Sequence, residues 1–125
     1  MNARAALRNY ARHESTAQVE GESPEKLIVL LLQKGCVLLK QAQHSLEADD
    51  LSVFHESTTH CMQILVALRG LLDFEKGGEV AIQLATTYDA INSSLFKAKR
   101  ERSNIQLNKL HAALTELLDG WTSIV

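Results

Sequence analysis

Regular apolar spacing, interrupted by a single proline, is the feature that most restricts what this chain can fold into. Apolar residues recur every three or four positions over most of its length, the spacing that places side chains on one face of an α-helix. Two consecutive glycines, Gly77 and Gly78, separate two such stretches, and glycine adopts positive φ without steric cost. We therefore predict a structural turn at Gly77 and Gly78, where one helix ends and the next begins.

The pattern and its interruptions predict four long helices. The first should begin at Pro24, with Ser23 as its N-cap, and run to about residue 46, before a break at residues 48–50. The second should end near the glycine pair, and Ser103 should cap the fourth. Predicted core residues of the second and third helices are Phe54, Thr58, Cys61, Leu65, Leu68, Leu72, Val80, Leu84, Thr87, Ile91, Leu95 and Ala98, with Ala81, Ala85, Tyr88 and Asn92 on an edge beside them.

These helices predict an all-α fold, an antiparallel four-helix bundle with a short extra N-terminal helix. A chain of 125 residues, 46% hydrophobic, is long enough to bury a core and short enough to be one domain, residues 1–125. Residues 1–18 should form a mobile N-terminal segment and linker. Within it, Ala3, Leu7 and Tyr10 recur at helical spacing, so this segment should dock on another surface.

Charge and composition exclude several classes of function. The net charge of −2 gives no general attraction to nucleic acid or to anionic membranes. No apolar run approaches the ~18 residues of a membrane-spanning helix, and the N-terminus lacks the apolar region of a signal peptide. Cys36 and Cys61 fall inside apolar helical stretches, which indicates free, buried thiols. We therefore expect a cytoplasmic protein without membrane insertion or nucleic-acid binding.

No pattern of catalytic or metal-binding residues meets its geometric requirement. His55 and His60 flank a Glu, but zinc-protease histidines stand four positions apart, and five positions place the two on different helix faces. The glycine pair lacks the continuation of a phosphate-binding loop. Neither cysteine has an evident base beside it for nucleophilic chemistry. We therefore expect no enzyme activity, no cofactor and no metal.

The first predicted helix carries more apolar surface than a core requires. Residues 27–32 are apolar for almost two turns and hence around the whole circumference, whereas packing on one face uses about half of them. The surplus positions are candidates for a groove that binds another chain. Gly35, in the same helix, costs roughly 1 kcal/mol relative to alanine and suggests close approach of another backbone.

The stretch around the glycine pair carries a specific motif. Residues 72–81 follow the pattern L-D-x-E-x-G-G-E-[IV]-A, and residues 84–92 follow L-x-x-x-Y-D-x-x-N. Together they resemble the signature of the FliS family, the flagellar export chaperones that hold flagellin. Tyr10, and Ser23-Pro24 followed by Leu27-Ile28, resemble further positions of that family, and Trp121 stands where its members often end the last helix.

The resemblance implies a function and a set of binding residues. A FliS-like chain binds the disordered C-terminal segment of flagellin in an apolar groove and prevents polymerisation before type III flagellar secretion. Further implied partners are a component of the export gate and, through an unoccupied groove, a second copy as a homodimer. Leu7 and Tyr10 would form an N-terminal plug over the empty groove. The expected partner-binding residues are Leu27, Leu30, Leu31, Ala81, Leu84, Ala85, Tyr88, Asp89 and Asn92.

Two other classes of helical bundle remain as alternatives. A histidine phosphotransfer domain has a similar length but needs an exposed histidine followed by a cation, commonly H-x-x-K-G. A helical adaptor of another secretion system would share the bundle and the apolar surplus. The histidines at 44, 55, 60 and 111 all lack the phosphotransfer sequence.

Overall fold

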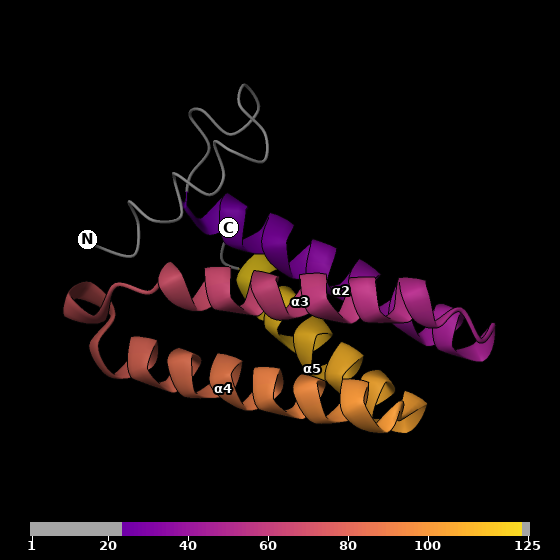
Figure 1. Ribbon diagram of the computed structural model, residues 1–125. Helices are drawn as coiled ribbons and strands as arrows, with labels where there is room; N and C mark the ends of the chain where they lie inside the picture. The colour runs from indigo at the N-terminus through magenta and orange to yellow at the C-terminus, as the bar shows by residue number, and fades with distance from the viewer. Residues whose placement is uncertain (1–23, 124–125) are drawn as a thin grey trace.

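The computed structural model describes residues 24–123, and these residues form four helices, α2 to α5 (Figure 1). The helices are α2 (Pro24–Glu47), α3 (Leu51–Gly70), α4 (Phe74–Glu101) and α5 (Asn104–Thr122), and successive helices run in opposite directions. The prediction of an all-α bundle is therefore confirmed. The predicted N-terminal helix and the Ser23 cap lie outside the described residues.

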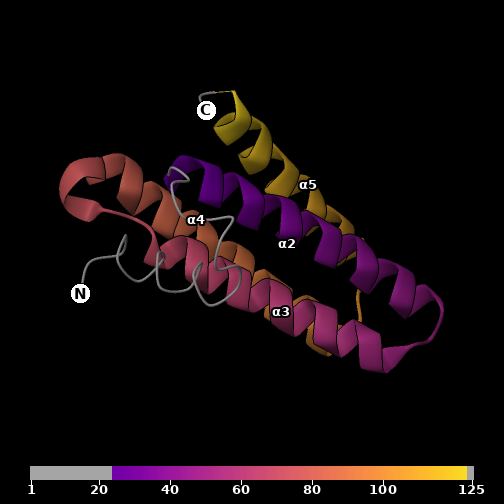
Figure 2. The same ribbon diagram turned by 90° about the horizontal axis from the view of Figure 1, so that it is seen from above.

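Each helix of the bundle has two main neighbours. α2 and α4 both pack against α3 and α5 and have little contact with each other, so they occupy diagonal positions. α5 crosses behind the other helices, and its C-terminal end lies near the start of α2 in both views (Figures 1 and 2). The core between the helices consists mostly of leucine, with Phe54 and Tyr88 as its largest fully buried side chains. α4 and α5 make the least extensive of the four main helix contacts.

Side-chain caps set the helix boundaries. Asp50 accepts a hydrogen bond from the backbone N–H of Val53 at the start of α3, and Ser103 accepts one from Gln106 N–H at the start of α5. The N-cap of α4 is Asp73, whose Oδ1 lies 3.1 Å from the backbone nitrogens of both Glu75 and Lys76. Because Asp73 begins a new helix, the predicted end of the second helix at the glycine pair is wrong. α3 ends at Gly70.

The predicted structural turn at Gly77 and Gly78 is present as a kink inside α4. Gly78 has φ 49° and ψ −124°, a conformation that only glycine adopts readily. A Cβ added at Gly77 would lie 2.8 Å from the Cβ of Ala81, closer than two carbon atoms can approach. One turn of helix therefore precedes the kink, and the long part of α4 begins after it.

Replacing Gly78 by alanine should lower the free energy of unfolding by about 1–3 kcal/mol, because a Cβ disfavours this backbone conformation. Urea denaturation of the two proteins would measure the difference. Gly70→Ala is the matched control, since Gly70 ends α3 with no atom within 4 Å of an added Cβ. An unchanged midpoint for Gly78→Ala would show that the kink does not require glycine.

The buried stripe of α4 differs from the predicted one. In the second half of the helix Ile91, Leu95 and Ala98 are buried, as predicted. In the first half the buried residues are Ala81, Ala85 and Tyr88, which were expected on a flanking edge. Val80, expected in the core, is 62% exposed, and Leu84 and Thr87 are only half-buried. Small residues allow close approach between helices, so α4 packs through its alanines. The larger apolar side chains are left beside α5.

Gly35 lies in a closely packed part of α2, but the neighbours of an added Cβ are side chains and not the backbone that was expected. An added Cβ would lie 3.2 Å from Cδ1 of Leu114 in α5 and 3.8 Å from Cγ2 of Ile64 in α3. The thiol of Cys61 lies 3.8 Å from the Gly35 carbonyl oxygen. Burial raises the pKa of this thiol to about 12. Both cysteines are free thiols, as predicted.

Candidate functional site: an apolar groove between α4 and α5

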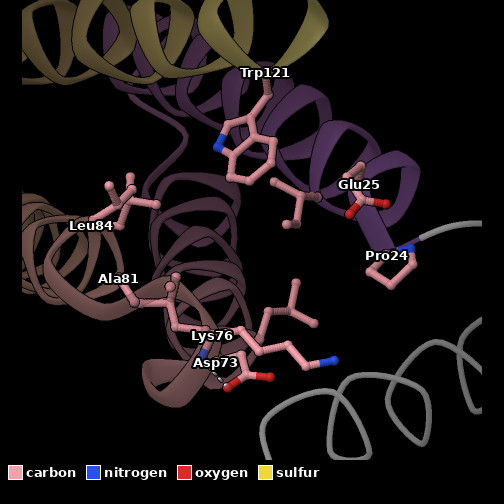
Figure 3. A pocket seen from close by; sticks show the side chains of 12 residues that line it. Pro24, Glu25, Asp73, Lys76, Ala81, Leu84 and Trp121 are labelled. Atoms are coloured by element: carbon pink, nitrogen blue, oxygen red, sulfur yellow. Dashed lines mark hydrogen bonds between the residues drawn. The ribbon is translucent and has the colours of Figure 1, made fainter. Parts of the chain in front are cut away.

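A pocket of about 290 Å³ opens at the end of the bundle where α2 begins and α5 ends. We call it the terminal pocket. Trp121 of α5 lies on one side of it, Ala81 and Leu84 of α4 on a second, and Pro24 and Glu25 of α2 on a third (Figure 3). The remaining lining residues are Ile28, Leu71, Leu72, Asp73, Lys76, Gly77 and Val80.

A second pocket, of about 530 Å³, lies between the middle parts of α4 and α5. We call it the middle pocket. Its apolar lining includes Ile91 from α4 and Leu117 from α5, and Glu116 supplies its one charged side chain. The other lining residues are Thr86, Thr87, Ala90 and Ala113.

The two pockets follow each other along α4 and α5. On α4, Leu84 lines the terminal pocket and Thr87 the middle pocket, three residues further along; on α5, Trp121 and Leu117 are related in the same way, four residues apart. Residues three or four apart are neighbours on one helix face, so the two pockets lie in succession along the same face of each helix. We call this surface the α4–α5 groove.

The polar groups inside the groove are largely satisfied within the chain. The hydroxyls of Thr86 and Thr87 donate to the carbonyl oxygens of Ile82 and Gln83, at 3.0 and 2.9 Å. At the rim of the terminal pocket, the Asp73 carboxylate already caps α4. The rest of the lining is mainly apolar, and its charged members are Glu25, Asp73 and Lys76 in the terminal pocket and Glu116 in the middle pocket.

Tyr88 lies beneath the groove rather than on its surface. Its side chain is 1% exposed, and burial raises the pKa of its hydroxyl. The Trp121 side chain lies close enough to offset part of that rise in pKa, which places the phenol near the indole of the terminal pocket. The Tyr88 ring thus supports the wall that Trp121 forms.

The expected partner-binding residues are divided among several places. Ala81 and Leu84 line the terminal pocket. Leu27 is buried, Leu31 is half-buried against the core, and Leu30 is 53% exposed, but none of these three lines either pocket. The structure therefore places none of these three leucines in a pocket with Ala81 and Leu84, although Ile28 of the same helix does line the terminal pocket.

Asp89 and Asn92, two polar members of that set, line neither pocket. Asp89 accepts from Arg69 of α3 at 2.9 Å, an exposed ion pair. Asn92 is half-buried, and its Oδ1 has no hydrogen-bond partner within the described part of the chain. Ala85 is 5% exposed and belongs to the core. Tyr88, Asp89 and Asn92 therefore do not form one exposed cluster, and their role in partner binding stays a prediction.

Several residues of the groove were missed from the sequence. Ala113 and Leu117 belong to the apolar stripe of α5, which the spacing alone assigns to the core. Val80 and Thr87 had been assigned to the core of α4 in the same way. The only available signal was a mismatch: the apolar stripes of α4 and α5 are broader than the contact between these two helices.

The groove is not accompanied by features of a metal site. Among residues 24–123, no group of three or more His, Cys, Asp or Glu side chains is arranged to hold a metal ion. Within the same range, no helix has both the length and the apolar character that crossing a membrane requires. The fold and the groove define a class, the helical bundles with an open apolar surface that can accept another chain.

The chain belongs to the FliS family: the model of that family, described as flagellar protein FliS, matches residues 6–125. The flagellar secretion chaperone FliSB of Pseudomonas aeruginosa is 32% identical over 124 residues, which cover 99% of this chain and 98% of that protein. The flagellar secretion chaperone FliS of Salmonella typhimurium is 26% identical over 121 residues, covering 96% and 90%.

A similar protein from Campylobacter jejuni, also named flagellar secretion chaperone FliS, is 31% identical over 106 residues, covering 82% of this chain and 80% of that protein. Family membership confirms the prediction of a flagellar export chaperone. Because these relatives are named as chaperones, it also confirms that the chain is not an enzyme.

Proposed function

We propose that this chaperone binds the disordered C-terminal segment of flagellin in the α4–α5 groove, in the cytoplasm, before type III flagellar secretion. The observation that carries the proposal is the groove itself, two adjoining apolar pockets left open by the packing of α4. A bundle that has already buried its core gains further burial of apolar surface only from another chain. The names of the relatives, flagellar secretion chaperones, point to a flagellar cargo.

Occlusion is the physical basis of the proposed activity. The end of flagellin must pack against other flagellins in a filament, so covering its apolar stripe prevents premature polymerisation. Ordering a disordered segment costs about 2–5 kcal/mol, which moderates the affinity and allows release at export. The proposed mechanism uses only binding and release and needs no cofactor.

Calorimetric titration of the full chain with the C-terminal ~40 residues of its flagellin tests this proposal, since that length supplies several helical turns. One-to-one binding with a negative heat-capacity change is expected, because apolar surface is buried. Absence of binding by this segment, with intact flagellin monomer still bound, would place the recognised part elsewhere in flagellin.

We further propose that Leu7 and Tyr10, which lie outside the described residues, plug the empty groove until cargo displaces them. Pro24, the first described residue, lines the terminal pocket, so the N-terminal segment is attached at the edge of the groove. An extended segment of this length reaches several tens of ångströms, enough to return along α4 and α5.

Deleting residues 1–18 should raise the affinity for the flagellin segment by roughly twofold to tenfold, because a competing internal ligand is removed. Calorimetry would measure the affinity, and hydrogen exchange of the free protein should show faster exchange in α4 and α5. Unchanged affinity together with unchanged exchange would refute the plug.

Two further partners belong to the same proposal. An export-gate component would bind the loaded chaperone on a surface that cargo leaves open. A second copy could cover the empty groove as a homodimer. Sedimentation with and without the flagellin segment tests the homodimer, since cargo should dissociate it into monomers.

A further inference from the structure

A row of exposed side chains runs along the outer face of α4, the helix at the lower edge of the bundle in Figure 1. Beyond the kink, its members follow one another at intervals of three or four residues, so they line up on one face of the helix. They are Glu79, Ile82, Thr86, Asp89, Ser93, Phe96 and Arg100, and all seven are exposed. We call this surface the α4 stripe.

The α4 stripe faces away from the α4–α5 groove. A step of two residues turns an α-helix by about 200°, so Ile82 lies on nearly the opposite side of α4 from Leu84, which lines the terminal pocket. Of the stripe residues, only Thr86 lines a pocket. A partner bound on the stripe would therefore leave the groove largely open.

The stripe carries one large apolar side chain towards each end. Ile82 is 53% exposed and Phe96 is 54% exposed, which gives two apolar sites that another chain could cover. Thr86 and Ser93 lie between them, and their small side chains allow another helix to pack closely. Val66 of α3, 62% exposed and one turn from Arg69, adds apolar surface beside the stripe.

The two ends of the stripe have opposite charges. Glu79 stands at its start and Arg100 at its end, and neither makes an ion pair within residues 24–123. At the centre, Asp89 is already paired with Arg69 of α3, with 2.9 Å between the nitrogen and the oxygen. A complementary partner therefore carries a cation opposite Glu79 and an anion opposite Arg100.

The α4 stripe is complementary to itself when it is turned end to end. Ile82 and Phe96 each lie seven residues from Asp89, one on either side. Glu79 and Arg100 lie at similar separations from Asp89, ten and eleven residues. A second copy rotated by 180° about an axis through Asp89 therefore brings Ile82 of one copy to Phe96 of the other, and Glu79 to Arg100.

We propose that a second copy of the chain docks antiparallel on the α4 stripe, with the twofold axis at Asp89. This dimer contains two contacts between Ile82 and Phe96 and two ion pairs between Glu79 and Arg100. It differs from a homodimer that covers the empty groove, because it leaves the groove open and forms with flagellin bound as well. A single pair of helices buries an area at the low end for protein interfaces, so we expect association in the micromolar range.

Exchanging the charges at the two ends of the stripe tests this arrangement. Glu79→Arg brings two cations together at each end of the dimer, and Arg100→Glu brings two anions together. Each variant alone should therefore raise the dimer dissociation constant at least about tenfold. An equimolar mixture of the two variants should form a heterodimer, because unlike charges then meet at both ends. Sedimentation equilibrium of the full chains measures these constants.

Asp119→Arg is the matched control, because Asp119 is exposed on α5 and its replacement changes the net charge by the same amount as Glu79→Arg. This variant should dimerise like the original chain. Ile82→Glu should also raise the dissociation constant at least about tenfold, since it places a carboxylate against the Phe96 ring of the second copy. Saturation of the original chain with the flagellin segment should leave its dimer constant unchanged.

Other outcomes contradict the inference. A chain that stays monomeric throughout the micromolar range has no such interface. Single charge variants that dimerise like the original chain, or a mixture that forms no heterodimer, would place the second copy on another face. A dimer that the flagellin segment dissociates would lie over the α4–α5 groove. Failure of the flagellin segment to bind would refute the proposed function alone, because the charge exchange is measured on the chaperone without cargo.

Discussion

Replacing Tyr88 by alanine should lower the free energy of unfolding by about 3–5 kcal/mol, the range expected for removing a buried aromatic ring. The side chain is 1% exposed and among the largest fully buried ones in the bundle. Its removal would leave a cavity between α4 and the core and would remove the support of Trp121. Urea denaturation followed by circular dichroism measures the loss directly.

Tyr88→Phe is the matched control for this prediction. It keeps the ring and removes only the hydroxyl, so the loss should be far smaller than that of Tyr88→Ala and no more than about 1.5 kcal/mol. A Tyr88→Ala protein as stable as the original chain, but defective in binding flagellin, would return Tyr88 to the ligand-facing role that the sequence predicted.

Placing a carboxylate in each pocket should nearly abolish flagellin binding. We expect Val80→Glu combined with Ala90→Glu to weaken the affinity at least about a hundredfold, since each carboxylate would lose its water beneath an apolar cargo segment. Both side chains are exposed in the free chain, so the stability should change by no more than about 0.5 kcal/mol for each substitution. Calorimetry and denaturation on the same samples separate the two effects.

Two single variants locate the binding surface. Ile82→Glu, on α4 but outside the pockets, should leave the affinity unchanged. Leu30→Glu tests the α2 surface that the sequence had included in the groove. A large loss of affinity for Leu30→Glu, with normal binding by the double variant, would move the cargo site to the exposed face of α2.

The helices and most of their ends could be predicted from the sequence because local chemistry determines them. Ser103 caps α5 as expected, and the break at residues 48–50 falls where α2 ends. The end of α3 was predicted too late, because the apolar repeat continues through Leu72 without a break. The carboxylate of the next residue, Asp73, nevertheless caps a new helix.

The buried face of α4 could not be determined from hydrophobicity alone. This helix carries two adjacent apolar stripes, and the side chains of Val80 and Leu84 are larger than those of Ala81 and Ala85. Transfer energy favours burying the larger stripe. Helix packing favours the smaller one, because alanines let backbones approach closely, and in this bundle packing determines the outcome.

The position of the groove depends on which helices are neighbours, and periodicity does not contain that information. The apolar residues 27–32 correctly predicted a surplus, since Leu30 remains exposed. However, none of Leu27, Leu30 and Leu31 lines either pocket, and the middle pocket lies between α4 and α5. Its residues on α5 are indistinguishable in sequence from core residues.

Fluorescence of Trp121 tests the central claim most directly, because it is the only tryptophan of the chain and lines the terminal pocket. A flagellin C-terminal segment without tryptophan is titrated into the full chain, and calorimetry establishes saturation. Flagellin in the α4–α5 groove should cover the half-exposed indole and shift its emission to shorter wavelength. Unchanged emission at saturation would mean that flagellin binds elsewhere on the bundle.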